Sequence, residues 1–207
     1  MATLDFNNTT DLSNTRLRAM CLAGMDGWAT GRVTLRIRYS RGADFSGRCY
    51  YNDGRIFVNL GRHVVFPYRM GTNIARARAV GRCWYRPVYT IELRTGYELV
   101  LFVFMHELYH LLVKRSRRNP RQKESMCDRF ATRHLIDRYG ARVRCDSGRS
   151  IDRGVWDFQD LDAFVAAAQD RRRRRVTPPT RAIGDTAPAG ARQLWLFSGA
   201  APAAAAE

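Results

Sequence analysis

The chain is poor in lysine and histidine, and its cysteines show no close pairing. Only Lys114 and Lys123 are lysines, so 33 of the 35 basic residues are arginines, and there are four histidines. The five cysteines are odd in number and form no Cys-x-x-Cys motif. The sequence therefore predicts neither a zinc ribbon nor a disulfide framework.

Long apolar runs are also lacking. No stretch reaches the about 18 uninterrupted apolar residues of a candidate membrane span, because the longest run, around Leu99, ends at His106 and Glu107. Residues 1–8 have neither the basic region nor the apolar region of a signal peptide. We therefore expect a cytoplasmic protein with no membrane partner.

Positive charge is abundant. The 207 residues include 35 basic and 19 acidic side chains, which gives a formal net charge of +16 and a pI near 10.6. A GC-rich genome would explain arginine in place of lysine, but it would not explain the excess of charge. Such a surplus favours an anionic partner, nucleic acid before an acidic membrane surface. We expect DNA as a partner and a nucleoid-associated location.

The motif that organises the chain is His106-Glu107-Leu108-Tyr109-His110, which reads H-E-x-x-H inside an apolar segment, residues 99–113. In a helix the two histidines lie one turn apart on one face. At that spacing they can hold one Zn²⁺ ion, with Glu107 as the general base for hydrolysis. The alternative is an ordinary core helix with two hydrogen-bonded histidines. Burial of two histidines and a carboxylate without a partner is costly, so the apolar flanks favour zinc.

A catalytic zinc site needs a third protein ligand besides the two histidines. Residues 124–139 read as a second helix, in which Glu124 and Asp128 share a face because they are four residues apart. We predict that Glu124 binds the metal and that Asp128 accepts the free N–H of a ligand histidine. The alternative third ligands are His134, Asp128 and Cys127.

Patterns elsewhere predict an α+β fold. Helices are expected at residues 10–28 and 158–174, and strands at residues 33–39 and 88–93. Residues 48–60 read as a hairpin with a tight Asp-Gly turn. We expect a zincin-like arrangement in which a small antiparallel or mixed sheet packs on the motif helix and on the second helix. An edge strand beside the motif helix would pair with an extended substrate, although the sequence does not identify that strand.

Two stretches are candidates for nucleic-acid contact. Residues 61–88 mix arginines with aromatic side chains, which suits a single-stranded nucleic acid but equally a solvated, irregular loop. Residues 171–175 are five consecutive arginines, which would contact phosphates or simply solubilise a helix end. The candidate contact residues are Arg76, Arg78, Arg82, Trp84, Arg171, Arg172 and Arg173.

From residue 176 the composition changes to Pro, Ala, Gly and Thr, which is typical of a disordered linker. The predicted divisions are a zinc-metallopeptidase-like domain (1–170), a basic run and linker (171–192), a short peptide (193–197) and a disordered tail (198–207). The short peptide, Gln193-Leu194-Trp195-Leu196-Phe197, carries apolar anchors that local structure cannot cover. Such anchors usually occupy a groove on a partner, although the peptide could also fold back onto the domain.

The peptide Q-L-x-L-F resembles the short segment by which bacterial proteins bind the replication sliding clamp. The resemblance implies that Gln193 is hydrogen-bonded and that the apolar side chains of Leu194, Leu196 and Phe197 enter a pocket on the clamp. It makes the bacterial sliding clamp an expected partner.

The region from Leu12 to Tyr139 resembles the SprT-like and related minimal zinc peptidases, in the order helix, β-meander, H-E-x-x-H helix and ligand-bearing helix. The resemblance implies a zinc metalloprotease with His106 and His110 as ligands and Glu107 as base. SprT-like proteins usually supply a third histidine, whereas this chain offers Glu124. The E-x-x-x-D spacing of this helix is similar to glutamate-ligand zincins and to regulatory peptidases of the ImmA/IrrE type.

In eukaryotes, an SprT-like protease with a clamp-binding peptide and basic DNA contacts degrades proteins crosslinked to DNA. By analogy, the leading expectation is a zinc-dependent endopeptidase that acts on DNA-associated proteins and is tethered to the clamp. One alternative is an ImmA/IrrE-type peptidase that cleaves a repressor. The other is a non-catalytic DNA- or clamp-binding module.

Overall fold

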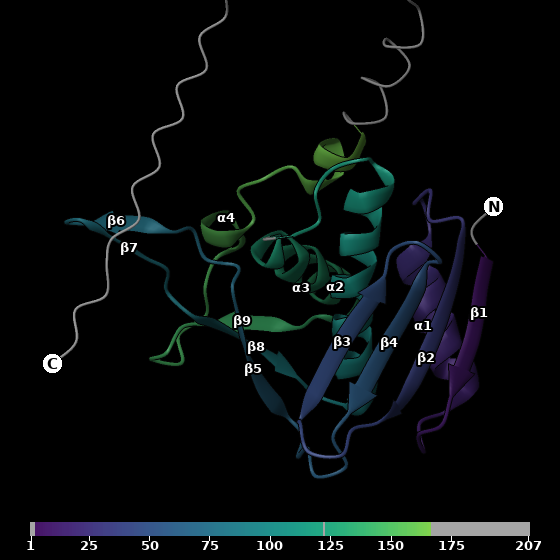
Figure 1. Ribbon diagram of the computed structural model, residues 1–207. Helices are drawn as coiled ribbons and strands as arrows, with labels where there is room; N and C mark the ends of the chain where they lie inside the picture. Colours follow the sequence, from purple (N-terminus) through teal and green to yellow (C-terminus); the bar gives the residue numbers. More distant parts are fainter. Residues whose placement is uncertain (1–2, 122, 167–207) are drawn as a thin grey trace, which may run out of the picture.

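The computed structural model describes residues 3–121 and 123–166 (Figure 1). Its elements, in chain order, are β1 (Thr3–Asn8), α1 (Asn14–Met25), β2 (Arg32–Tyr39), β3 (Phe45–Tyr50), β4 (Arg55–Leu60), β5 (Tyr68–Thr72), β6 (Arg78–Val80), β7 (Cys83–Tyr85), β8 (Tyr89–Leu93), α2 (Gly96–Arg115), α3 (Glu124–Tyr139), β9 (Arg142–Arg144) and α4 (Arg153–Trp156). The predicted mixed α+β architecture with small sheets is confirmed.

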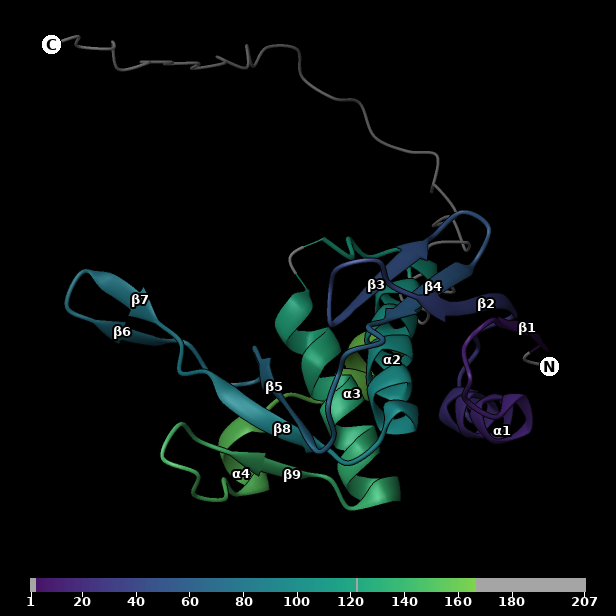
Figure 2. The same ribbon diagram turned by 90° about the horizontal axis from the view of Figure 1, so that it is seen from below.

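The largest sheet has four strands in the order β1-β2-β4-β3. β1 and β4 both pair parallel to β2, and β3 pairs antiparallel to β4, so β3 is an edge strand. Along β2, Val33, Leu35 and Ile37 are buried whereas Arg36 and Arg38 are exposed, which gives the sheet one apolar face and one polar face. Helices α1 and α2 lie on the apolar face (Figures 1 and 2).

Helix α2 is the core of the domain. The side chain of Thr95 caps it by accepting from the backbone N–H of Glu98, and Glu98 accepts in return from the backbone N–H of Arg94 at 2.6 Å. Of the described helices, only α2 is long and apolar enough to cross a membrane, and 89% of its 18-residue apolar window is buried inside the domain. That coverage is typical of a core helix in a globular domain.

Helix α3 packs along α2 and carries the second predicted set of site residues (Figure 2). It ends at Gly140, whose φ of 65° is the left-handed C-terminal cap that glycine adopts without strain. The predicted bounds, residues 124–139, are confirmed.

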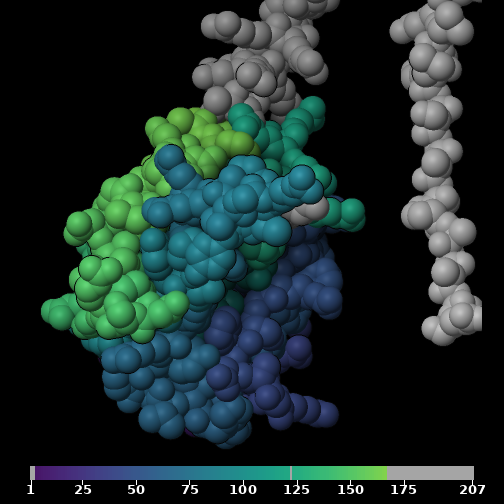
Figure 3. All heavy atoms as spheres, turned by 90° about the vertical axis from the view of Figure 1, so that its left-hand side faces the viewer, coloured from purple at the N-terminus to yellow at the C-terminus, as the bar shows by residue number. Residues whose placement is uncertain are grey.

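Smaller elements complete the domain. Strands β5, β8 and β9 form an antiparallel sheet, and β6 and β7 form a hairpin that projects from it (Figures 1 and 3). A second apolar cluster joins α4 to this sheet through the fully buried Trp156, which packs with Ile74, Tyr89 and Val143.

The predicted helix at residues 10–28 is the shorter α1, capped by Ser13, and the predicted strand and hairpin patterns correspond to β2, β3, β4 and β8. Three features differ from the prediction. Strand β1 was not predicted, because its short alternation becomes a strand only by pairing with β2. Residues 61–88, for which an irregular loop was one of two interpretations, contain β5, β6 and β7. In the predicted helix at residues 158–174, residues 158–160 are not helical. A helix begins at Leu161, and the side chain of Asp160 caps it. The remainder, from residue 167, lies outside the described part of the chain.

Candidate metal centre

The two motif histidines point their Nε2 atoms to the same place. Their ring centroids are 5.0 Å apart on one face of α2. His106 Nδ1 lies 2.8 Å from Oδ1 of Asp128, and His110 Nδ1 lies 3.1 Å from the backbone oxygen of Pro120. Both partners are acceptors, so each Nδ1 donates its hydrogen. Nε2 is therefore the ring atom of each histidine that would bind a metal, after His106 loses the Nε2 hydrogen that it donates to Glu124.

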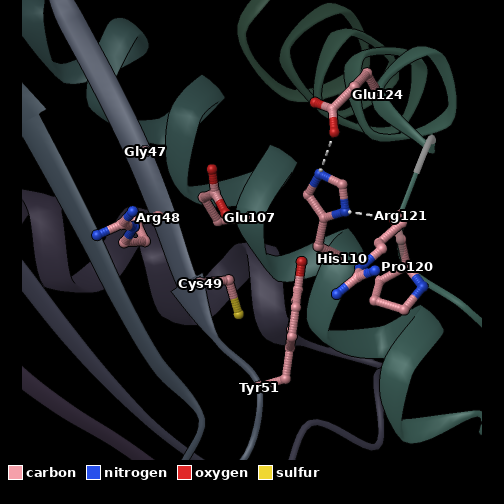
Figure 4. A pocket seen from close by; sticks show the side chains of 9 residues that line it. All are labelled: Gly47, Arg48, Cys49, Tyr51, Glu107, His110, Pro120, Arg121 and Glu124. Atoms are coloured by element: carbon pink, nitrogen blue, oxygen red, sulfur yellow. Dashed lines mark hydrogen bonds and ion pairs between the residues drawn. The ribbon is translucent and has the colours of Figure 1, made fainter.

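Glu124, the first residue of α3, faces the Nε2 atoms of both histidines. Its Oε2 lies 3.1 Å from Nε2 of His106, and its Oε1 lies 3.3 Å from Nε2 of His110. In a tetrahedral site with bonds of about 2.0–2.1 Å, neighbouring ligand atoms are about 3.3 Å apart. Each histidine Nε2 is therefore at ligand-to-ligand spacing from one oxygen of the Glu124 carboxylate. Figure 4 shows the carboxylate of Glu124 facing the His110 ring.

Cys127 also reaches the histidines. One ligand atom from each of His106, His110 and Cys127 lies within 4.8 Å of the other two, so this group could hold a metal ion. The thiol is fully buried, and burial raises its pKa, so it is protonated without a metal, whereas a ligand must be a thiolate. By contrast, the hydrogen bond from His106 lowers the pKa of Glu124 to about 2, so this carboxylate is already ionised. The distances favour Glu124 over Cys127 as the third ligand, because its oxygens lie 3.1 and 3.3 Å from the two Nε2 atoms, whereas the ligand atoms of the Cys127 group are spread over up to 4.8 Å.

His134 is separated from this group. It lies near α1, where its Nε2 is 3.6 Å from the position that a Cβ on Gly24 would take. Of the alternative third ligands, only Cys127 is therefore brought beside the histidines with its ligand atom facing them, because Asp128 is engaged with the other side of the His106 ring.

Asp128 connects the site to the small sheet. Its Oδ2 accepts the backbone N–H of Asn73 at 2.7 Å and the side-chain amide of Asn73 at 3.2 Å, while Oδ1 holds His106. Burial alone would lower the pKa of His106, but its bonds to Asp128 and Glu124 outweigh this effect and raise the pKa to about 9. Asn73 was not among the predicted site residues, and no local pattern marks it, because it acts across 55 positions of sequence.

Glu107 lies against the edge strand β3. Burial raises its pKa to about 7, although the positive charge of His106 opposes this shift. Gly47 of β3 leaves the space that the carboxylate occupies. A carboxylate with a pKa near neutrality is suited to exchange protons with a reacting group.

An open cleft of about 460 Å³ lies beside the site (Figure 4). Its lining comprises Gly47, Arg48, Cys49, Tyr51, Glu107, His110, Pro120, Arg121 and Glu124. The hydroxyl of Tyr51 points toward His110, and the side chain of Arg121 lies beside Pro120 (Figure 4). Neither Tyr51 nor Arg121 was predicted, since nothing in the local sequence distinguishes them from other tyrosines and arginines.

A second cleft of about 210 Å³ continues on the other side of Gly47. Phe45, Met70, Phe102 and Val103 make its lining more apolar, and Glu107 belongs to both clefts. Gly47 and Glu107 line both clefts, and Phe45, Arg48 and Cys49 of β3 each line one of them.

The predicted nucleic-acid residues lie apart from the metal centre. Arg78, Arg82 and Trp84 are exposed on the β6–β7 hairpin, which points toward the viewer in Figure 3, and Trp84 is 79% exposed. Arg76 instead stacks on Phe158, with 4.3 Å between its guanidinium carbon and the ring centre. The remaining candidates, Arg171, Arg172 and Arg173, and the peptide residues Gln193, Leu194, Leu196 and Phe197, lie outside the described residues.

No protein-family model, curated protein or solved structure matches this chain. The geometry of the site is therefore the basis for assigning a function.

Proposed function

We propose that this protein is a zinc-dependent peptidase of the SprT-like or a related minimal zincin type. The observation that supports the proposal is that the Nε2 atoms of His106 and His110 both face the carboxylate of Glu124, in a cleft that Glu107 also lines. A bound zinc ion would supply Lewis acidity, which activates water and polarises a carbonyl group.

Glu107 is the general base in this proposal. It accepts a proton from the attacking water and returns it to the leaving amine. Two side chains of the cleft, Tyr51 and Arg121, are the candidate donors to the oxyanion that develops on the substrate carbonyl. Asp128 and Asn73 orient His106.

The substrate that suits the two clefts is an extended polypeptide. Edge strand β3 has no strand on its outer side within the described residues, and a substrate segment would add to it by main-chain hydrogen bonds. The peptide group nearest Gly47 would then lie beside Glu107. The more apolar cleft around Phe45 and Met70 would accept one substrate side chain.

DNA-associated proteins are the substrate class we propose. The supporting observations are the net charge of +16 and the exposed hairpin with Arg78, Arg82 and Trp84. Tethering to the sliding clamp by residues 193–197 belongs to the same proposal. Cleavage of DNA-bound protein that increases when DNA is added would support it. Cleavage of one cognate repressor without DNA would instead indicate the regulatory peptidase.

Metal analysis tests the site directly. Elemental analysis of the purified full chain should find about one zinc per molecule. Glu124→Ala should lose most of this zinc, and Cys127→Ser should retain it. Zinc retained by Glu124→Ala but lost by Cys127→Ser would replace Glu124 with Cys127 as the third ligand. A folded wild-type chain that takes up no zinc would contradict the proposed function.

A further inference from the structure

The polar face of the four-stranded sheet is uncovered within the described residues, because both helices that pack on this sheet lie on the other face (Figures 1 and 2). The strand register places Arg36, Phe57 and Arg48 side by side in one row across β2, β4 and β3. The neighbouring row contains Arg55 and Tyr50, which also point outward. We call these residues, together with Arg38, the open sheet face.

The open sheet face has an excess of positive charge. Among the described residues, Arg36, Arg38 and Arg48 have no carboxylate within ion-pair distance. Only two neighbouring arginines are paired, Arg32 with Asp5 at 3.7 Å and Arg55 with Asp53 at 2.6 Å. Three guanidinium groups are therefore available to an anion on this face.

Aromatic rings lie between these arginines. Tyr50 and Phe57 meet edge to face, with 5.5 Å between ring centres and 69° between planes. The guanidinium carbon of Arg38 lies 5.7 Å from the Phe57 ring centre, and that of Arg48 lies 5.8 Å from the Tyr50 ring centre. Tyr50 is 41% exposed. Phe57 is half-buried, so part of each ring faces solvent on the polar side of the sheet.

We infer that the open sheet face binds single-stranded nucleic acid. Arg36, Arg38 and Arg48 contact phosphates, and the rings of Tyr50 and Phe57 stack on unpaired bases. Arginines that alternate with aromatics on a sheet are the combination that proteins use for single strands, because an unpaired base offers a free ring face. A duplex offers phosphates but keeps its base faces stacked, so it would leave the two rings unused.

The open sheet face adjoins the cleft of the candidate metal centre. Arg48 belongs to the open sheet face and also lines the cleft beside Glu107. A bound strand would therefore pass along the mouth of the candidate metal centre. Binding itself does not depend on zinc or on hydrolysis, so it is testable separately from the proposed peptidase activity.

Fluorescence anisotropy with a labelled oligothymidine of about 12 nucleotides and a duplex of equal length tests the inference on the full-length protein. Arg36→Gln/Arg38→Gln should weaken oligothymidine binding about tenfold. It should also reduce the slope of log affinity against log salt by about 0.7 for each phosphate that the variant no longer neutralises. Tyr50→Thr should weaken oligothymidine binding about tenfold and leave duplex binding unchanged, because only a single strand stacks on the ring.

The matched control is Arg18→Gln/Arg138→Gln, which removes the same charge from exposed positions on α1 and α3. This control should keep wild-type affinity. An equal loss in the control would mean that affinity follows total charge, and it would overturn the assignment to the open sheet face. Unchanged oligothymidine binding in both face variants would overturn it as well, whatever the hydrolytic activity of the protein.

Discussion

Gly47 and Glu107 are packed so closely that no side chain can stand between them. A Cβ added to Gly47 would lie 2.8 Å from Cγ of Glu107, closer than real Cβ contacts, and it would also meet Val103 at 2.8 Å. The glycine therefore allows β3 to run directly against the motif helix. The position of the proposed base and the position of the proposed substrate strand are set by the same contact.

Gly47→Ala should displace Glu107 from β3. We expect hydrolysis to fall about a hundredfold, as for the loss of a positioned general base, at a stability cost of about 1–3 kcal/mol from overpacking. Zinc content should remain at the wild-type level. Gly42→Ala is the matched control, since its added Cβ meets nothing within 4 Å. Wild-type activity in Gly47→Ala would show that the close packing does not position Glu107.

Glu107→Gln should separate metal binding from hydrolysis. The substitution keeps the shape of the side chain but removes the group that accepts the proton, so turnover should fall by about 10²–10⁴-fold. Elemental analysis should show unchanged zinc, because the ligand atoms belong to other residues. Hydrolysis that persists in the pure variant would contradict the assignment of Glu107, and normal cellular function of the variant would favour a non-catalytic module.

Asp128→Asn should weaken the metal site without removing a ligand. The carboxylate accepts from His106 at 2.8 Å and fixes which ring nitrogen faces the metal. Loss of such a partner typically reduces metal affinity about 10–100-fold, which competition with a zinc chelator measures. Asp146→Asn is the control and should bind zinc as the wild type does, because Asp146 is exposed in a loop that contributes no residue to the site. Equal affinities in the two variants would exclude a role for Asp128 in orienting His106.

Cys145 should react with alkylating agents near neutral pH. Its hydrogen bond with Ser147, at 3.0 Å, lowers its pKa to about 7, so half of it is thiolate near that pH and the fraction rises as the pH increases. Peptide mapping after iodoacetamide treatment should show half-maximal rate near pH 7. Cys21 and Cys127 are buried and should remain unmodified in the folded protein. Ser147→Ala should move the midpoint to higher pH. An unchanged midpoint would show that the hydrogen bond with Ser147 does not lower the pKa of Cys145.

The local sequence pattern predicted the structure correctly where residues close together in the sequence determine it. Residues 124–139 are helical as predicted, because apolar spacing, an acidic first residue and a following glycine act within one segment. The four-residue spacing of Glu124 and Asp128 predicted a shared face, and both side chains do point toward His106. Strand β1 was not predicted because it depends on pairing with β2.

The sequence by itself determined that His106 and His110 lie on one face of a helix with Glu107 between them, because the helical period leaves no other arrangement. Only the tertiary structure decided what faces them. The approach of Glu124, the anchoring of Asp128 by Asn73 and the passage of β3 over Glu107 each join segments that are far apart in the chain. Such contacts follow from how the sheet and helices pack around one core, and no local spacing encodes that packing.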